Sequence, residues 1–211
     1  MPTKQEIRSE ETKRSILQAA GQLFSTRGYD SVTMREIAKA AGCSHTTIYI
    51  YFKDKEALLH QLSMGPLAEL KEQLTAILNE PGPVPEEKLT RISEEMIRFY
   101  LANRSMYEIF FTVRSVRVDE PNPATELNRM RNSLFALLQQ AVEMCLPVPH
   151  TAEQVLAYSR IYFYTLQGIM ATYANSEESG EQLMERLGST FREAIEVLLI
   201  GFTHKLTHGG N

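Results

Sequence analysis

The chain has 211 residues, 43% of them hydrophobic and 23% charged, so it can bury a sizeable core and has the composition of an ordinary soluble globular protein. Its net charge of −4 excludes nonspecific wrapping of nucleic acid along the whole surface. The charge is uneven, however: residues 1–60 carry nine Lys and Arg against seven Asp and Glu, and the remainder carries thirteen against nineteen.

The sequence pattern excludes two further classes of protein: those built on disulfides or cysteine metal sites, and those that are secreted or span a membrane. Cys43 and Cys145 have no spacing typical of a disulfide framework or a thiolate metal site. The N-terminus lacks an apolar signal core, and the longest uncharged run, residues 161–176, is too short and too polar to span a bilayer. We therefore expect a cytoplasmic protein. Apolar residues recur at helical spacing and no strand pattern is visible, which predicts an all-α fold of about nine helices.

In chain order, residues 1–8 are expected to form a disordered lead, and the first helix is predicted over residues 10–27. Its inward stripe includes Ile16, Ala20 and Phe24, and Gly28 follows its last turn. This helix is expected to complete a three-helix head with the two short helices that follow.

Those two helices are separated by a tight turn. Thr33 and Glu36 have the spacing of a capping box, in which each side chain bonds the backbone N–H of the other. Gly42 lies where a left-handed residue would end the first helix, and Ser44 would cap the second at once. Two helices joined by so short a turn must cross steeply, which is the geometry of a helix-turn-helix pair.

The second helix of the pair, residues 45–52, is unusual in its exposed residues. Ile48 and Phe52 are four apart and can pack inward, which leaves an uncharged hydrogen-bonding surface suited to phosphates and base edges. That surface comprises His45, Thr46, Thr47, Tyr49 and Tyr51. Lys55 follows in the first turn of the next helix, capped by Asp54, where a cation opposes the helix dipole and a bound phosphate would explain its placement. The alternative is a structural hairpin of helices with a solvated Tyr and Thr face.

The residues of this segment resemble the N-terminal signature of the tetracycline-repressor-like (TetR) family of bacterial transcription regulators, from about residue 12 to residue 62. The matching positions are Thr33, Arg35, Ile37, Ala38, Ala41, Gly42, Ser44, Thr47, Ile48, Tyr49, Tyr51, Phe52, Lys55, Glu56, Leu58 and Leu59. The resemblance implies phosphate contacts by Thr33, Thr47, Tyr49, Tyr51 and Lys55. It implies base reading by Arg35, His45 and Thr46, with Ser44 also in the DNA-binding set. Cys43 replaces the usual aliphatic residue, and its oxidation would disturb DNA docking.

A DNA-binding domain is thus predicted over residues 1–54, and an effector-binding and dimerisation domain over residues 55–211. Helices are predicted over residues 55–78, 86–103, 105–116, 124–145, 151–174 and 181–205, with a loop at 79–85. Gly65 and Pro66 should kink or break the first of these, and we hypothesise that this helix transmits effector binding to the head. A fixed bend without motion is the alternative.

The last two predicted helices are apolar nearly all round. A monomer of this size has little core to cover both, so we predict that they meet their copies across a two-fold axis as a four-helix bundle. TetR relatives dimerise in this way.

The family resemblance also implies a small-molecule effector in the second half of the chain. The candidates are Met96, Tyr100, Tyr107, Phe111, Arg114, Tyr158 and Tyr162. Tyr, Phe and Met side chains make an apolar cavity with a few hydroxyl groups, so an apolar or amphipathic effector is expected. The alternative for each aromatic residue is simple core packing, and for Arg114 an exposed position.

The resemblance thus implies a transcriptional repressor that is released from a palindromic operator by its effector, and the sequence offers less support for other functions. No Glu-x-x-His pair, Ser/His/Asp order or phosphate loop is visible, which argues against an enzyme and against a cofactor. His204 and His208 are four apart and could share a metal, but the Gly-Gly-Asn end suggests a frayed tail, so no metal site is expected. A ligand-binding or metal-binding helical protein without a DNA role is the remaining alternative; the intact Tyr49, Tyr51 and Lys55 argue against it.

Overall fold

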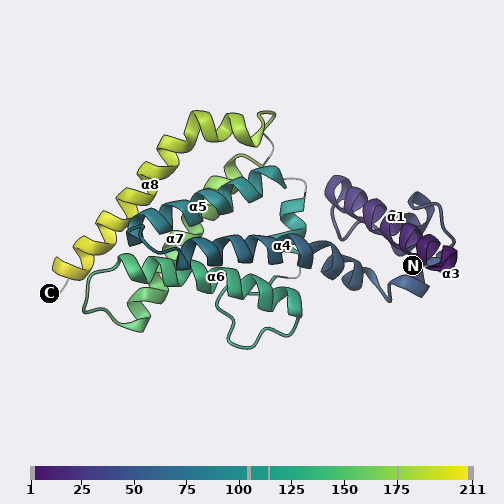
Figure 1. The fold of residues 1–211 in the computed structure, drawn as a ribbon, viewed down its shortest axis with the longest axis horizontal. Helices are drawn as coiled ribbons and strands as arrows, with labels where there is room; N and C mark the ends of the chain where they lie inside the picture. The colour runs from purple at the N-terminus through teal and green to yellow at the C-terminus, as the bar shows by residue number, and fades with distance from the viewer. Residues whose placement is uncertain (1–2, 104–105, 114, 175, 209–211) are drawn as a thin grey trace. The chain divides into compact units, whose positions relative to one another are not determined.

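The computed structural model describes residues 3–103, 106–113, 115–174 and 176–208 (Figure 1). Over these residues the chain forms eight α-helices and one π-helical segment, and no strand, which confirms the all-α fold predicted from the sequence. The helices are α1 (Lys4–Arg27), α2 (Met34–Ala40), α3 (His45–Tyr51), α4 (Lys55–Asn79), α5 (Pro85–Ala102), η2 (Glu108–Thr112), α6 (Glu126–Cys145), α7 (Ala152–Thr172) and α8 (Gly180–His208). No helix in the described ranges is long and apolar enough to cross a membrane.

The chain folds as two compact units. The first comprises Met1–Ala68, Ser105–Val116 and Pro123–Arg129, and the second comprises Glu69–Arg104, Arg117–Asn122 and Met130–Asn211. Helix α4 is shared, because its first part lies in one unit and its last part in the other. The functional boundary expected between residues 54 and 55 stays a prediction.

The first unit contains the three-helix head. Helix α1 packs against α2, and α2 packs against α3. Apolar side chains from all three helices form an interior with almost no solvent exposure: Ile16, Ala20, Phe24, Ile37, Ala38 and Ile48. Short helices have little stability alone, so this shared interior is what holds α2 and α3 in place.

The expected disordered lead is wrong for residues 3–8. Thr3 and Glu6 form a capping box, with the Glu6 N–H donating to the Thr3 hydroxyl at 3.3 Å, and α1 begins at Lys4. The sequence pattern missed this turn because Ile7 is the sole apolar residue between Lys4 and Ser15, so no inward stripe is visible there. A cap rather than core burial starts the helix.

Helix α4 begins at Lys55 as predicted, but it is not broken at Gly65 and Pro66. The helix runs without interruption from Lys55 to Asn79 with Pro66 inside it. Proline removes one hydrogen bond and crowds the preceding turn. Buried leucines on both sides of this point, Leu58, Leu59, Leu67, Leu70 and Leu74, explain why the helix continues across it.

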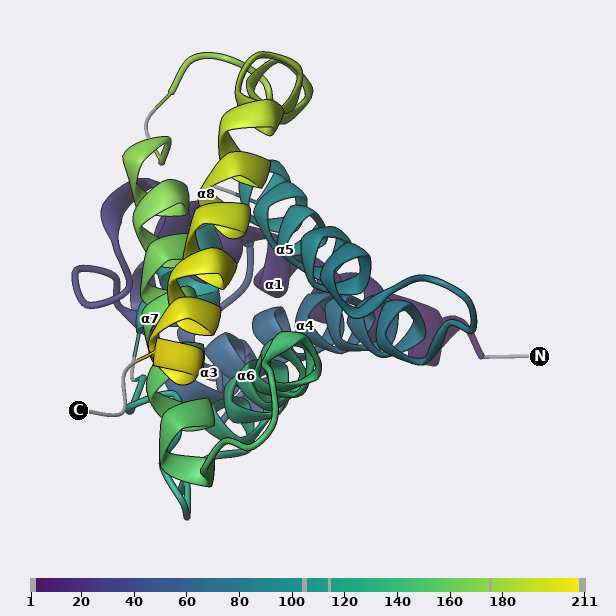
Figure 2. The same cartoon turned by 90° about the vertical axis from the view of Figure 1, so that its left-hand side faces the viewer.

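The second unit is built on α5, α7 and α8, which pack against one another (Figure 2). Helix α7 begins with a capping box between Thr151 and Gln154, and the sequence has the residue types and the spacing that this box needs. The buried Lys88 ammonium of α5 donates to the Leu78 carbonyl at 2.9 Å, which satisfies one of the last carbonyls of α4. These contacts fix the helices that carry most of the effector candidates.

One predicted helix is shorter than expected and of another type. A helix is predicted over residues 105–116, and the described part of this stretch forms the five-residue π-helical segment η2 in place of a regular α-helix. The apolar residues Ile109, Phe110 and Phe111 are consecutive, and the first two are fully buried. A continuous apolar run has no helical period, so it did not support the predicted helix.

Candidate nucleic-acid interface

The helix-turn-helix pair begins with the capping box predicted at Thr33. The Thr33 N–H donates to Glu36 Oε2 at 2.9 Å, and the Glu36 N–H donates to Thr33 Oγ1 at 3.3 Å. Arg27 at the end of α1 forms an ion pair with the same Glu36 carboxylate at 2.9 Å. The start of α2 is therefore fixed to the end of α1 by side chains that can be read from the sequence.

These partners favour the ionised form of Glu36. Hydrogen bonds from the Thr33 hydroxyl and backbone, together with Arg27, lower the pKa of Glu36 from 4.5 to about 2. The carboxylate thus remains charged, and the cap intact, across the whole physiological range.

The turn between the helices is as short as predicted. Gly42 has a φ of 70°, the left-handed region that residues with a Cβ rarely adopt, and Ser44 accepts a bond from the Thr47 N–H at 3.0 Å. Helix α3 then extends from His45 to Tyr51, and Phe52 ends it. The prediction of a helix-turn-helix pair is confirmed in each of these parts.

Helix α3 keeps one side buried and presents the other to solvent. Ile48 has no exposed surface and Phe52 is 4% exposed, whereas His45, Thr46 and Tyr49 are exposed. The rings of His45 and Tyr49 meet edge to face at 5.1 Å across one turn. The buried pair anchors the helix, so the uncharged polar side faces outward, as expected for a recognition helix.

Some of the other side chains predicted to contact DNA form hydrogen bonds within the head. Thr33 and Arg35 are exposed, while Thr47 is half-buried and shares a 2.7 Å hydrogen bond with Ser44. The Tyr51 hydroxyl accepts a bond from Ser9 of α1 at 3.2 Å and keeps its own proton for a further acceptor. The structure thus brings the predicted set onto one helical pair and its immediate flank.

Lys55 has a role that the sequence did not reveal. Its ammonium donates to the carbonyls of Tyr29 at 2.7 Å and Val32 at 2.9 Å, and lies 4.3 Å from the centre of the Tyr29 ring. Its position at the start of α4 is therefore explained without a phosphate. Two of its three N–H donors are used by the carbonyls, and the predicted phosphate contact stays a prediction.

One exposed residue of α3 was overlooked. Ile50 is 76% exposed, which is unusual for isoleucine, and it lies beside Tyr51 in a groove of about 680 Å³ formed with the first turns of α1. Its spacing from Ile48, only two residues, could have shown that it cannot share the buried side of a helix.

The effector candidates are divided between the two units. Tyr107 and Phe111 lie in the first unit with their ring centres 5.5 Å apart. Met96, Tyr100, Tyr158 and Tyr162 lie on α5 and α7 of the second unit, and Arg114 lies outside the described residues. A groove of about 740 Å³ in the second unit is lined by none of the six described candidates.

Three of these side chains belong to the core. Met96, Tyr100 and Tyr162 are at most 4% exposed. Ser93 donates its hydroxyl proton to the Leu89 carbonyl at 2.7 Å, so the 2.6 Å contact with Tyr162 has the tyrosine as donor. Burial raises the pKa of Tyr162. The hydroxyl is satisfied inside the unit, as the core-packing alternative describes.

Both cysteines are free and half-buried. Desolvation raises the pKa of the Cys43 thiol, and it raises the pKa of Cys145 to about 12. Because the thiolate is the reactive form, neither environment favours oxidation.

A capped helix, a glycine turn and an outward-facing polar helix are the parts of a DNA-binding helix-turn-helix pair. The profile described as "Bacterial regulatory proteins, tetR family" matches residues 16–62. The HTH-type transcriptional regulator AcrR of Shigella flexneri is 38% identical over 99 residues, which is 45% of each chain. YdgC of Bacillus subtilis, an uncharacterised HTH-type transcriptional regulator, is 27% identical over 151 residues, or 70% of this chain and 68% of that one.

The fold agrees over nearly the whole chain. The transcriptional regulator FadR from Bacillus subtilis, solved in complex with stearoyl-CoA, aligns with a TM-score of 0.61 at 18% identity, covering 88% of this chain and 97% of that chain. Residues 16–62 thus match the DNA-binding segment of the TetR family of bacterial regulatory proteins, as the resemblance of these residues predicted, and the chain shares its fold with solved regulators of this kind.

The capping box generates a prediction about pH. Because the pKa of Glu36 is lower in the folded head than its ordinary value of 4.5, its ionised form stabilises the head above that pH, and this contribution is lost as the pH falls from 4.5 to about 2. Thr33→Val should raise the pKa of Glu36 toward 4.5 and lower the melting temperature at neutral pH. Carbon-detected NMR titration of the carboxyl group measures the first effect; an unchanged pKa in the variant would contradict it.

Proposed function

We propose that the protein is a homodimeric repressor that binds a near-palindromic DNA operator and is released from it by an apolar or amphipathic effector. The single observation that carries the DNA-binding part is the arrangement of α3, whose buried Ile48 anchors an exposed face of His45, Thr46 and Tyr49. Uncharged donors and acceptors of this kind match base edges and phosphates in a major groove. This role fits a protein located in the cytoplasm.

We assign the preference for a DNA sequence to exposed side chains of α2 and α3. Arg35, His45 and Thr46 are exposed and can read base edges, with phosphate contacts from Thr33, Thr47, Tyr49, Tyr51 and Lys55, and Ser44 holding the start of α3. We add Ile50, because an isoleucine that is 76% exposed on a recognition helix matches the methyl group of thymine.

Dimerisation is supported by an uncovered stripe on α7. Its members are exposed and spaced alternately four and three residues apart: Ala157, Ile161, Tyr164, Gly168 and Ala171. Ile161 is 45% exposed and Tyr164 is 60% exposed, although both are large and apolar. Spacing of four and three residues is the heptad pattern of helices that pack along a seam.

Helix α8 has a stripe with the same spacing. It comprises Thr190, Ala194, Val197 and Gly201, and Val197 is 57% exposed. Neither stripe contains a charged residue. Two such stripes from each of two copies would complete the four-helix bundle expected from the sequence, with α7 and α8 as its helices.

Effector control is assigned to α4 and the second unit. Helix α4 is continuous around Pro66 and contributes to both units, so a change in its curvature would alter the spacing of two heads on DNA. The effector needs only a difference in affinity between the two shapes, typically about 1–3 kcal/mol. Stearoyl-CoA is the first probe, because FadR of Bacillus subtilis was solved in complex with it.

Selection from a random duplex pool tests this function. The protein should retain near-palindromic sequences with half-sites about one helical turn apart, and stearoyl-CoA or cell metabolite extract should reduce the DNA retained. His45→Ala should retain a different set, because one base contact is lost at a cost of about 1–3 kcal/mol.

Absence of any enriched sequence would overturn the DNA-binding role. Enrichment of sites without two-fold symmetry would overturn the homodimeric operator. A His45→Ala variant with an unaltered preference would remove His45 from the reading set. Retention insensitive to every extract and to stearoyl-CoA would overturn effector release while leaving DNA binding intact.

Lys55→Ala separates a phosphate contact from a purely structural role. If the ammonium also binds a phosphate, the variant should weaken binding to all sequences alike and flatten the slope of log affinity against log salt by roughly one unit. Loss of the bonds to Tyr29 and Val32 alone would lower the melting temperature of the head and leave that slope unchanged. Binding isotherms at several salt concentrations, with thermal unfolding of the same samples, distinguish the two results.

Gly168→Leu tests the dimer. A Cβ at Gly168 has no neighbouring atom within 4 Å in its own chain, so the fold should tolerate the leucine, whereas a seam on α7 should not. We expect the variant to be monomeric by light scattering, with an unchanged helical circular dichroism spectrum. Ser189→Leu, at an exposed position of α8 outside the stripe, is the matched control and should remain dimeric. A dimeric Gly168→Leu protein would contradict the proposed seam.

A further inference from the structure

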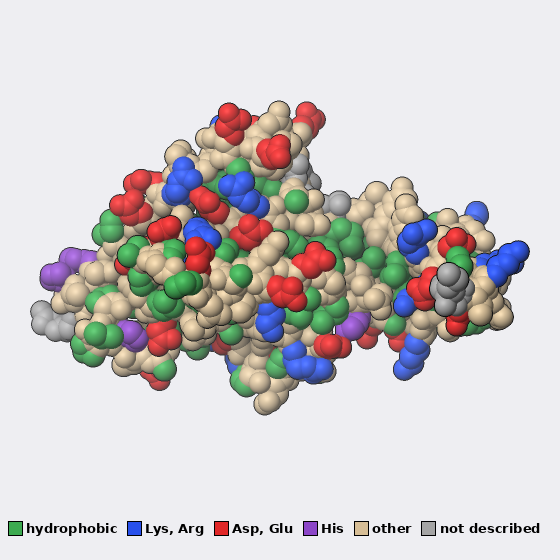
Figure 3. All heavy atoms as spheres, in the orientation of Figure 1, with side chains coloured by type: hydrophobic (Ala, Val, Ile, Leu, Met, Phe, Trp, Pro, Cys, Tyr) green, Lys and Arg blue, Asp and Glu red, His purple; other side chains and the backbone are tan. Residues whose placement is uncertain are grey.

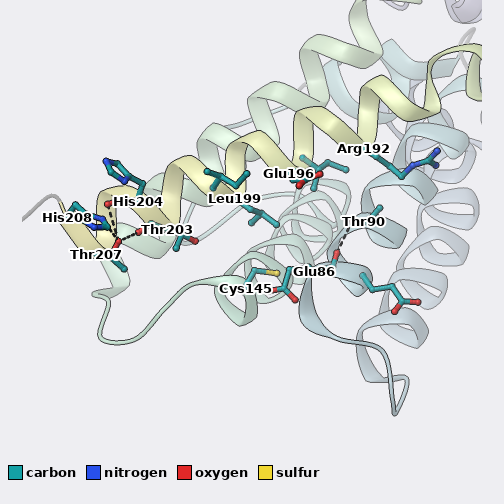
Figure 4. A pocket seen from close by; sticks show the side chains of 13 residues that line it. Glu86, Thr90, Cys145, Arg192, Glu196, Leu199, Thr203, His204, Thr207 and His208 are labelled. Atoms are coloured by element: carbon teal, nitrogen blue, oxygen red, sulfur yellow. Dashed lines mark hydrogen bonds between the residues drawn. The ribbon is translucent and has the colours of Figure 1, made fainter.

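Two histidines meet at the end of α8. The sequence suggested a frayed tail there, but α8 extends through His208, and the rings of His204 and His208 stack with their centres 4.6 Å apart. Both side chains are exposed, and both line the end of the groove between α5 and α8 (Figure 4). In the space-filling view, histidine side chains gather at this end of α8 (Figure 3).

The contacts of Thr207 fit one tautomer of His208. Thr207 Oγ1 donates its single proton to the Thr203 carbonyl at 2.9 Å. With the hydroxyl proton placed there, the 2.7 Å contact between Thr207 Oγ1 and His208 Nδ1 is a hydrogen bond in the tautomer that carries its proton on Nδ1. In a neutral ring this leaves the lone pair on Nε2, which is directed away from the threonine.

This is the arrangement that proteins use to prepare a histidine for a metal. A metal-binding imidazole usually donates its second ring N–H to an oxygen, which fixes the tautomer and orients the ring. His204 and His208 are four residues apart, so their side chains leave the same side of the helix one turn from each other. Histidines at this spacing on a helix bind zinc in proteins whose other ligands come from elsewhere.

We propose that His204 and His208 bind one divalent transition-metal ion, of the class of Zn²⁺, Ni²⁺ or Cu²⁺, through Nε2 of His208 and a ring nitrogen of His204. The two rings are exposed, and they turn out of their stacked arrangement on binding so that one nitrogen of each points at the ion. Imidazole is a favoured ligand for these ions, whereas Mg²⁺ and Ca²⁺ prefer oxygen. Within the described ranges no group of three or more His, Cys, Asp or Glu is placed to hold a metal. Water completes the coordination shell, so binding is weaker than at a four-ligand structural zinc site.

Calorimetric titration of the untagged, full-length protein with ZnCl₂ or NiCl₂ tests the site. At neutral pH we expect one ion for each chain. His204→Gln and His208→Gln should each lower the affinity at least about tenfold, because the second ligand then no longer acts within the same molecule. Thr207→Val should weaken binding about tenfold by releasing the tautomer of His208.

A swapped variant is the matched control. Lys205→His combined with His208→Lys keeps the composition of the tail but leaves the histidines adjacent in sequence, on different sides of the helix. It should bind metal as weakly as His208→Gln. Equal affinity of the swapped variant and the natural chain would overturn the proposal, as would titrations with both ions that give no binding. His45, His60 and His150 are unchanged in every variant, so a site at any of them would persist in all variants and also contradict the proposal.

Discussion

The burial of Ile48 is the constraint on which the DNA-binding head depends. A helix of seven residues has almost no stability in water, so α3 exists only where tertiary packing holds it. Ile48 and Phe52 supply that packing on one side, and no other residue of the helix is fully buried. Because α3 is buried on one side only, it depends on the head for its stability, and the rest of its surface is free for a ligand.

The helices around α3 are then fixed by caps and clamps. Thr3, Thr33 and Ser44 each accept a backbone N–H at a helix start, and Asp54 does the same for α4. Lys55 joins the start of α4 to the backbone that precedes α2. Each of these interactions satisfies a backbone group that a helix end or turn leaves open, which is why so small a unit can hold a precise surface.

The sequence predicted the features that have a local signal. The boxes at Thr33 and Thr151, the turn at Gly42 and the buried side of α3 follow from residue types at fixed spacing. The capping box at Thr3 had the same signal, but the lack of apolar residues before Ser15 obscured it. The clamp of Lys55 joins residues 23 and 26 positions apart, and no local pattern contains that information. The effector site is the least predictable part, since aromatic spacing is the same for a packed core and for a cavity.

Helix α8 combines two features in one register. The spacing that relates Thr190, Ala194, Val197 and Gly201 continues without a shift to His204 and His208. In the proposed dimer the two imidazoles would therefore lie at the end of the seam, with water in the remaining positions of the ion. Any ion that binds the associated form more tightly than the single chain must favour association to the same degree, because the two equilibria are linked. The end of α8 is thus where metal binding and the assembly of two heads on DNA would share one surface.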